Sequence, residues 1–393
     1  MKSVDKIRRR IDAYRRRLRH EYIMWMFRKS EARKRRQFLE WQARLDAARP
    51  DVLVGANFVE FGGTRHHMKA IEKFSTLRVN LLPDDRLLRT VTPYDLATSF
   101  RDDFLSYTPV GLKAVHSHVF PWFIEWCHQK KQTHGIRWIH THHNWYYPEF
   151  GRGELEPWQI EFNKQFLFAL GNADVCLSVS KWQRDFLKKS FQVETHYLPN
   201  GVNVAICDAA DAARARRKTG LDRFVLYAGR NDPVKNPADF VRLAISLPQH
   251  QFLMLGQGLS NTTLHDEWEV MVPGNLKVMG EATHQETQDA IAACSALVVT
   301  SKREGLPTLV LEAMTQGKPV VVPDEDGCME AIGHGEFGFI YRQGDIDDLS
   351  AITSEAISDR ERCSKSRKRI LEEYDWRVVM QKLDRIYSGK NAL

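Results

Sequence analysis

The chain has 393 residues, 43% hydrophobic and 27% charged, which is long enough for two ordinary domains with separate cores. Glycine and proline, at 23 and 15 residues, are near average usage, and no repeat is visible. Disordered, fibrous and repeat proteins are therefore excluded. The net charge of +7 is uneven, because residues 1–49 carry 17 basic and 6 acidic side chains, whereas the remainder carries 40 basic and 44 acidic. Attraction to an anionic partner would belong to the first 49 residues.

Residues 1–49 are predicted to form a basic amphipathic helical arm that ends before Pro50. Arginine triplets at 8–10 and 15–17 occupy one face, and apolar residues recur on the other at steps of three and four. These apolar positions are Val4, Ile7, Ile11, Tyr14, Leu18, Tyr22 and Trp25. Such a helix suits an anionic membrane surface or a helical pairing seam with protein, including the chain's own body. Nucleic acid is the disfavoured partner, because a basic run alone does not establish nucleic-acid binding.

The six cysteines are far apart and form no Cys-x-x-Cys pair, which favours a reducing compartment over a disulfide framework. The apolar stretch at 22–27 is too short for a signal peptide. No run approaches the roughly 18–20 apolar residues of a membrane span. We therefore expect a cytoplasmic protein, peripheral at most at the inner face of the membrane.

Beyond Pro50 the pattern alternates between short apolar runs and helical segments. A short buried strand at 51–57 leads through a glycine loop at 60–64 into a helix from Arg65. Further strands are expected at 114–119, 136–140, 175–179, 224–228, 251–255, 276–279, 296–300 and 319–322. This alternation predicts an α/β chain with parallel sheets covered on both faces. The strand–loop–helix pattern begins again at 224–230. We therefore place a domain boundary at 199–203 and expect two similar lobes with a cleft between them.

Two acidic residues mark one candidate site, since Glu304 and Glu312 lie eight positions apart across the start of a predicted helix. A carboxylate in the cleft can accept hydrogen bonds from hydroxyls, and free backbone amides at 305–309 suit a phosphate. A sugar nucleotide offers both a polyol and phosphates. The alternative is a capped surface helix with ordinary acidic residues.

Two basic residues mark a second candidate site in the same lobe. Gly229 ends a predicted strand, and Arg230 and Lys235 follow in the loop and at the start of the next helix. Two fixed cations beside a helix start would neutralise a diphosphate and the charge that develops when it leaves. Loop cations that are merely solvated are the alternative, and the presence of a second anion-binding loop in this lobe argues against it.

These motifs occur in one order with several others. They are Phe61-Gly62-Gly63, 179–182, 199–203, Gly229-Arg230 with Lys235-Asn236, Glu304-x7-Glu312, 317–321 and 374–376. Over residues 51–393 the chain resembles the family-four retaining glycosyltransferases of the GT-B fold, whereas the arm departs from the family pattern. The resemblance implies two Rossmann-like, doubly wound lobes facing a cleft. An acceptor-side lobe at 51–203 would be joined by the C-terminal helix 374–393, and 204–373 would form the nucleotide-sugar-binding lobe.

The resemblance also implies which residues bind the donor. They are Gly62, Gly63, Arg230, Lys235, Glu304, Thr308, Leu309 and Glu312. Arg230 and Lys235 would bind the diphosphate, Glu304 would touch the transferred sugar, and Glu312 would accept hydrogen bonds from the ribose. The two glycines would let their loop approach the phosphates closely, and backbone amides at 308–309 would complete the anion site.

Histidines are dense in the first lobe, at positions 116, 118, 134, 140, 142 and 143. His140 and His142 could face one metal ion, but no carboxylate or cysteine lies at a supporting spacing, so we predict no metal site. In the family pattern a strand ends in Thr-x-His facing the donor sugar, which implies Thr141 and His143 here. His143 would hold sugar hydroxyls or the reacting centre without acting as a simple base. His118 would face the acceptor or be a core histidine bonded to backbone.

The resemblance implies a catalytic set of Arg230, Lys235, Glu304 and His143 that requires no cofactor. The acceptor hydroxyl would attack on the face that the nucleotide leaves, and a donor phosphate oxygen would receive the proton. The expected reaction is retaining transfer of a hexose-type sugar from a UDP or GDP donor to a hydroxyl of a saccharide or lipid-linked saccharide, in cell-surface polysaccharide or glycan synthesis. The alternative is a catalytically silent scaffold whose arm recruits partners or nucleic acid; the complete set of donor residues favours the enzyme.

Overall fold

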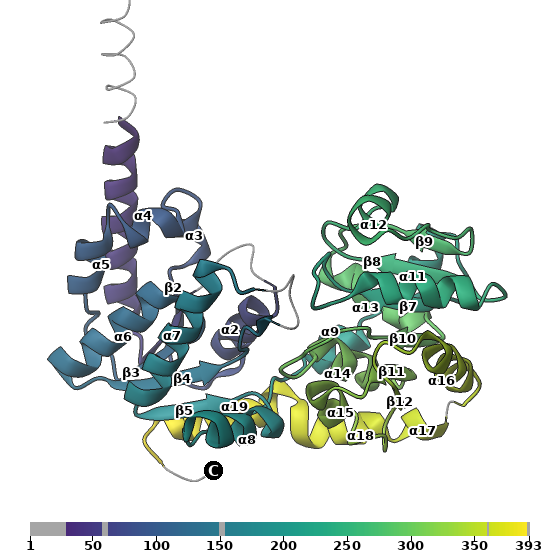
Figure 1. Cartoon of the computed structure of the whole chain (residues 1–393). Helices are drawn as coiled ribbons and strands as arrows, with labels where there is room; N and C mark the ends of the chain where they lie inside the picture. The colour runs from purple at the N-terminus through teal and green to yellow at the C-terminus, as the bar shows by residue number, and fades with distance from the viewer. Residues whose placement is uncertain (1–28, 57–61, 149–153, 360, 391–393) are drawn as a thin grey trace, which may run out of the picture.

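The computed structural model describes residues 29–56, 62–148, 154–359 and 361–390 (Figure 1). Within them the chain forms two parallel six-stranded sheets, each flanked by helices. The predicted α/β class with two Rossmann-like lobes is therefore confirmed. The limits of the two lobes at 51–203 and 204–373 stay a prediction.

The first sheet has the strand order β2-β1-β3-β4-β5-β6, and every neighbouring pair is parallel. Its strands are β1 (Val52–Gly55), β2 (Val79–Leu82), β3 (Ala114–Ser117), β4 (Arg137–His142), β5 (Val175–Ser178) and β6 (His196–Tyr197). The sequence pattern predicted four of them. It missed β2, which has the polar Asn80 inside a four-residue run, and β6, which is two residues long. Both are edge strands, where a short run suffices to pair on one side.

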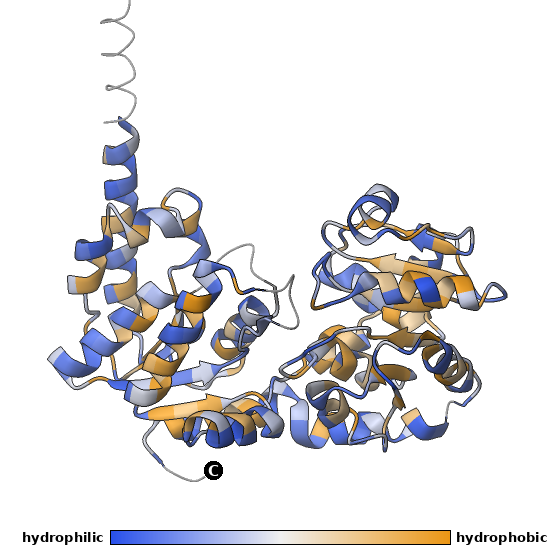
Figure 2. Cartoon of the chain, viewed as in Figure 1, coloured by the Kyte–Doolittle hydropathy of each residue, from blue (hydrophilic) through white to orange (hydrophobic). Residues whose placement is uncertain are grey.

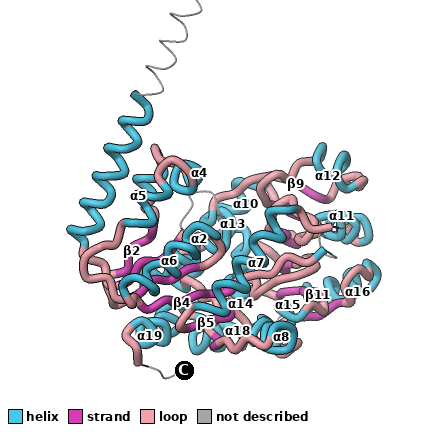
Figure 3. Tube along the Cα trace, turned by 60° about the vertical axis from the view of Figure 1, so that its left-hand side comes forward, coloured by secondary structure: helices cyan, strands magenta, loops and turns pink. Residues whose placement is uncertain are grey.

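Helices lie around this sheet, as the tube in Figure 3 shows. They are α2 (Gly62–Phe74), α3 (Asp85–Leu88), α4 (Pro93–Ala97), α5 (Arg101–Ser106), α6 (Pro121–His134), α7 (Pro157–Asn172) and α8 (Lys181–Phe191). Ordinary signals set their ends. A proline opens α4, α6 and α7, and the Ser180 side chain caps α8 by accepting from the Gln183 amide. Gly135 ends α6 at a positive φ of 64°.

The second sheet has the order β12-β11-β10-β7-β8-β9. Its strands are β7 (Val225–Ala228), β8 (Phe252–Leu255), β9 (Leu276–Val278), β10 (Ala296–Val298), β11 (Val320–Pro323) and β12 (Phe339–Tyr341). Its helices are α9 (Val204–Asp208), α10 (Ala212–Thr219), α11 (Pro237–Ser246), α12 (Asn261–Trp268), α13 (His284–Ala293), α14 (Thr308–Thr315), α15 (Asp326–Ala331), α16 (Ile346–Ser358), α17 (Glu361–Ser364) and α18 (Ser366–Arg369). The strands are strongly hydrophobic (Figure 2), as expected for parallel strands covered on both faces.

The last helix, α19 (Trp376–Tyr387), follows a π-helical turn at Ile370–Tyr374 and returns to the first lobe (Figure 1). Its apolar face shares a core with β1, β2 and α2. The Asp384 carboxylate accepts hydrogen bonds from the Ser75 hydroxyl at 2.6 Å and the Thr76 amide at 2.8 Å. The second lobe is thus followed by a helix that is built into the first, which ties the two lobes together.

A helix at 29–48 covers α5 and packs on the chain's own body. Phe38, Trp41 and Leu45 are buried in the core of the first lobe, where Phe38 stacks on Phe100 with ring centroids 5.2 Å apart. The apolar positions from Val4 to Trp25 lie outside the described residues. Contact of the arm with a membrane or another protein therefore stays a prediction. Among the described helices, none combines the length and apolar character needed to cross a membrane.

Candidate active site

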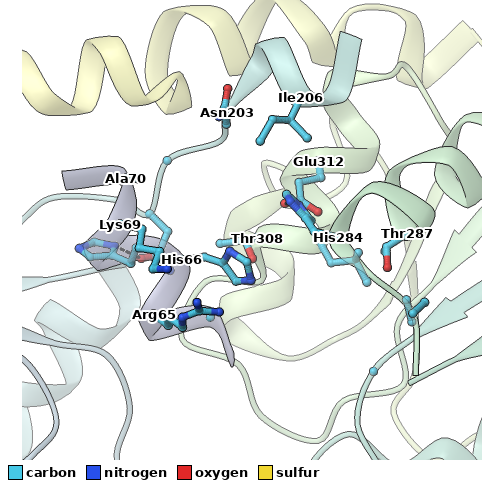
Figure 4. A pocket seen from close by; sticks show the side chains of 18 of the residues that line it. Arg65, His66, Lys69, Ala70, Asn203, Ile206, His284, Thr287, Thr308 and Glu312 are labelled. Carbon is cyan, nitrogen blue, oxygen red and sulfur yellow. Dashed lines mark hydrogen bonds and ion pairs between the residues drawn. The ribbon is translucent and has the colours of Figure 1, made fainter. Parts of the chain in front are cut away.

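A pocket of about 920 Å³ lies between the two lobes (Figure 4). The first lobe contributes α2, and the second contributes the loops after β7, β8 and β9 and the beginning of α14. This is where the carboxyl ends of parallel strands deliver their loops. The predicted donor residues that line it are Gly63, Arg230, Thr308, Leu309 and Glu312. Gly62 begins α2 next to Gly63.

The loop between β7 and α11 is held by its own hydrogen bonds. The Thr300 hydroxyl donates to the backbone oxygens of Lys235, at 3.0 Å, and Asn236, at 2.8 Å. Lys235 Nζ then meets Glu304 Oε1 at 2.5 Å. The structure therefore brings together two residues that come from separate sequence motifs. Both belong to the predicted donor set, but neither is among the residues that line the pocket.

Glu312 is oriented by two side chains that sequence reasoning missed. His284 Nε2 lies 3.0 Å from Glu312 Oε1, and Gln288 Nε2 donates to Glu312 Oε2 at 2.7 Å. The hydrogen bond with this carboxylate raises the pKa of His284 above its ordinary value. His284 and Gln288 are four residues apart on α13, so they share one helix face. That spacing was a visible signal, but nothing in the sequence indicated that α13 faces α14.

The segment around Glu304 contacts the first lobe directly. Trp182 Nε1 donates to the Gly305 backbone oxygen at 2.8 Å, and the Arg303 guanidinium lies 4.1 Å from the centre of the Trp182 ring. A β-carbon on Gly305 would come within 2.5 Å of the His143 backbone oxygen, so the close approach requires glycine here. This contact holds the residue after Glu304 against the backbone of His143.

The two histidines predicted to face the substrates lie together with a third. His118 Nδ1 and His143 Nε2 are 2.8 Å apart, and His67 packs edge-on against His143 with ring centroids 4.8 Å apart. His67 Nδ1 also lies 3.0 Å from Asn200 Oδ1. His67 was missed because it sits on α2, far from the histidine-rich segment, and its only signal is proximity to the glycine pair.

Burial controls the charge of this cluster. It lowers the pKa of His118 and His143 well below the ordinary histidine value, and that of His67 to about 4. All three rings are therefore neutral near pH 7. A neutral ring can exchange hydrogen bonds with a sugar hydroxyl without adding a positive charge to the cluster.

Two of the remaining histidines of the segment, His116 and His140, make hydrogen bonds within the fold. His116 Nδ1 lies 2.6 Å from the Tyr387 hydroxyl, and its Nε2 lies 2.7 Å from Thr141 Oγ1. Thr141 is buried in this contact. His140 Nδ1 is 2.9 Å from the Ser117 hydroxyl. Among the described residues, the histidines whose ligand atoms converge within 4.8 Å are His67, His118 and His143, so the pair first considered for a metal is not the converging one.

Two family models match the chain. The model of the glycosyl transferases group 1 matches residues 210–373, and that of glycosyltransferase family 4 matches residues 78–206. The two matches fall on the two lobes in the order in which the lobes occur, and the family-4 match begins after α2. The chain therefore belongs to the group 1 glycosyltransferases with the family-4 type of GT-B fold.

Curated relatives and solved structures agree with this assignment. The chain is 24% identical over 229 residues to an uncharacterized glycosyltransferase of Methanocaldococcus jannaschii, covering 56% of this chain and 61% of the relative. It is 27% identical over 248 residues to a phosphatidyl-myo-inositol mannosyltransferase of Mycobacterium leprae, covering 60% and 62%. The chain thus matches less than two thirds of the length of these relatives. The Anabaena protein HepE was solved in complex with UDP and glucose, and its structure superposes on this chain with a TM-score of 0.68. The superposition covers 86% of this chain and 100% of HepE at 18% sequence identity, so the two proteins share the fold.

Proposed function

We propose that this chain is a retaining glycosyltransferase that moves a hexose-type sugar from a nucleotide-diphosphate donor to a hydroxyl. The observation that carries the proposal is the pocket between the lobes, in which Glu312, Arg230 and the start of α14 lie on one wall. It offers a carboxylate for the ribose, a cation for the phosphates and free amides at a helix start. UDP and GDP are the nucleotides we expect, and the Anabaena neighbour was solved with UDP.

The proposed chemistry needs positive charge where the diphosphate leaves. Arg230 and Lys235 would stabilise that charge, and the Lys235–Glu304 ion pair would place the Glu304 carboxylate beside the transferred sugar. In a retaining reaction without a covalent intermediate, the acceptor hydroxyl attacks carbon 1 from the face that the diphosphate leaves. The carbon–phosphate oxygen bond breaks, the new glycosidic bond forms, and the hydroxyl proton passes to the departing phosphate oxygen.

One histidine of the cluster would bind the donor sugar. His143 is neutral, is fixed by His118, and lies against the segment that carries Glu304, so it suits a hydrogen bond to a donor hydroxyl. His118 is buried behind it and would act through His143. The acceptor would be a saccharide or a lipid-linked saccharide in polysaccharide or glycan synthesis. The basic arm, residues 1–49, remains our candidate for contact with an anionic membrane surface at the cytoplasmic face.

The experiment is incubation of the purified chain with UDP, GDP, ADP and CMP sugars, followed by detection of the released nucleotide. NMR of the product's anomeric proton then reports whether configuration is retained. Release from one donor, with retention, would support the proposal, and inversion would overturn the retaining mechanism. A chain that binds and turns over none of the donors would be the silent scaffold, with its function in the basic arm.

A further inference from the structure

The cations assigned to the diphosphate already face carboxylates within their own lobe. Arg230 lies 3.2 Å from Asp232, and Lys235 lies 2.5 Å from Glu304. Each pair is neutral, so the second-lobe constellation brings no net positive charge to the diphosphate of a sugar nucleotide, which is a dianion. Glu312 and Glu281 line the same pocket and make the local charge more negative. Additional positive charge is needed to hold the anion there.

That charge is present on the opposite wall, along α2. Arg65, Lys69 and Lys73 recur every four residues, so they form one stripe on the helix, and all three line the pocket. Arg65 and Lys69 share one carboxylate, that of Asp85, at 3.7 and 2.6 Å. Lys73 is exposed and makes no ion pair within the described residues. The three side chains of the stripe and the Asp85 carboxylate together carry an excess of two positive charges, and Glu72 of the same helix does not line the pocket.

The α2 helix is also close to the donor wall. The rings of His66 on α2 and His284 on the second lobe have centroids 5.3 Å apart, and His284 is the residue that orients Glu312. Figure 4 shows Arg65, His66 and Lys69 on α2 opposite Glu312 and His284. The α2 helix has 13 residues and begins at Gly62, so the positive end of its dipole lies beside Gly63 in the same pocket.

We propose that the α2 stripe is the first-lobe half of the diphosphate site, and that Arg65, Lys69 and Lys73 supply the net positive charge that the second lobe lacks. The inference rests on the proposed function, because it takes a nucleotide-diphosphate donor as the ligand. The donor then contacts both lobes at once, and the contacts to the first lobe are made by its diphosphate more than by its nucleoside. Arg230 and Lys235 orient the anion, whereas α2 balances its charge.

The test is calorimetric titration of the full chain with two series of ligands. One series is UDP, UMP and uridine, and the other is GDP, GMP and guanosine. The variants are Lys69→Gln, Lys73→Gln and the double variant. Lys164→Gln is the matched control, because this lysine is 69% exposed on α7 of the same lobe and does not line the pocket. Each removed charge should weaken diphosphate binding about three- to tenfold, with a smaller loss for the monophosphate and none for the nucleoside.

High salt should weaken wild-type diphosphate binding more than that of the double variant, because fewer charges remain to be screened. If the wild type binds UDP or GDP and the double variant binds it equally well, the inference is wrong while the proposed function stands. An equal loss of affinity for the diphosphate and the nucleoside would also overturn the inference, because it would mean that the variants change the shape of the pocket and not its charge. If the wild type binds no nucleoside diphosphate at all, the proposed function fails first. Unchanged melting temperatures would show that the glutamine variants fold, as expected for the exposed Lys73.

Discussion

Gly305 and His143 are in backbone contact across the interface of the two lobes. A β-carbon on Gly305 would lie 2.5 Å from the His143 carbonyl oxygen, a distance that real β-carbons do not adopt. The contact joins the end of the first-lobe strand β4 to the loop that carries Glu304. The relative placement of the proposed sugar-binding residues therefore depends on the absence of a side chain at Gly305.

Gly305→Ala should lower kcat/KM by about tenfold or more, because overpacking by one methyl group typically costs about 1–3 kcal/mol and here forces the Glu304 loop away from His143. Steady-state kinetics with the active donor measures the effect. The matched control is Gly274→Ala, where a β-carbon would meet nothing within 4 Å. If both variants keep wild-type activity, the lobe contact does not position the site.

Lys235→Ala should abolish most of the turnover and leave the fold intact. Loss of a group that stabilises developing charge typically costs about a hundredfold or more in kcat. The Lys235 side chain is 30% exposed, so its removal should shift the melting temperature little. Lys235→Arg, which keeps the charge opposite Glu304, should recover part of the activity. Wild-type turnover in the alanine variant would remove Lys235 from the mechanism.

The buried histidines should make stability fall in mild acid. Burial lowers the pKa of His142 in the folded chain to about 4, below the ordinary value of 6.5. As the pH falls from 6.5 toward 4, this histidine binds a proton in the unfolded chain but stays neutral in the folded chain. The free energy of unfolding therefore decreases by about 1.4 kcal/mol per pH unit for each such group. Above pH 6.5 both states are neutral and this contribution is complete.

His142→Leu tests this sign directly. Neither ring nitrogen of His142 finds a hydrogen-bond partner among the described residues, and the ring packs edge-on against Phe166. The variant should therefore keep its stability near pH 7, and its melting temperature should fall less steeply than that of the wild type on acidification. Calorimetric scans across the pH range give both curves. Parallel curves would mean that His142 is not a neutral buried group.

Chelation should leave transfer activity unchanged. His67, His118 and His143 converge, but the nitrogens by which His118 and His143 approach each other are engaged in their mutual hydrogen bond, and no carboxylate belongs to the group. In the proposed mechanism, positive side chains take the place of a metal at the leaving group. Activity after dialysis against a chelator, with metal analysis of the protein, checks this. Complete loss that is restored by added Zn²⁺ or Mn²⁺ would contradict it.

Most of the fold could be predicted because its strands are buried on both faces and read as short apolar runs. The strand β12 was missed because it is three residues long and follows a glycine-rich turn with Gly333, Gly335 and Gly338. The helix pattern at 29–48 was expected. Its docking on the first lobe depends on Phe38 meeting Phe100 and on Trp41 meeting Phe104, and the two residues of each pair are more than fifty positions apart in sequence.

The candidate site was predictable only where residues fall in compact motifs. Arg230, Lys235, Glu304 and Glu312 stand in such motifs, and their roles stay predictions until they are tested. His67, His284 and the α2 stripe gain meaning only through tertiary placement. His66 and His284 are 218 positions apart, yet their rings meet across the pocket. Side chains that act across a lobe interface leave no local pattern, which is why the sequence did not reveal them.

The pocket between the lobes is proposed to bind a nucleoside diphosphate through Glu312. Calorimetric titration of UDP and GDP into the wild type and into Glu312→Ala measures this binding. One nucleotide should bind the wild type and lose about 1–3 kcal/mol in the variant, the cost of hydrogen bonds between a carboxylate and the ribose hydroxyls. The corresponding 2′,3′-dideoxynucleotide should bind both proteins equally weakly. Binding of neither nucleotide, or equal binding by both proteins, would contradict the account.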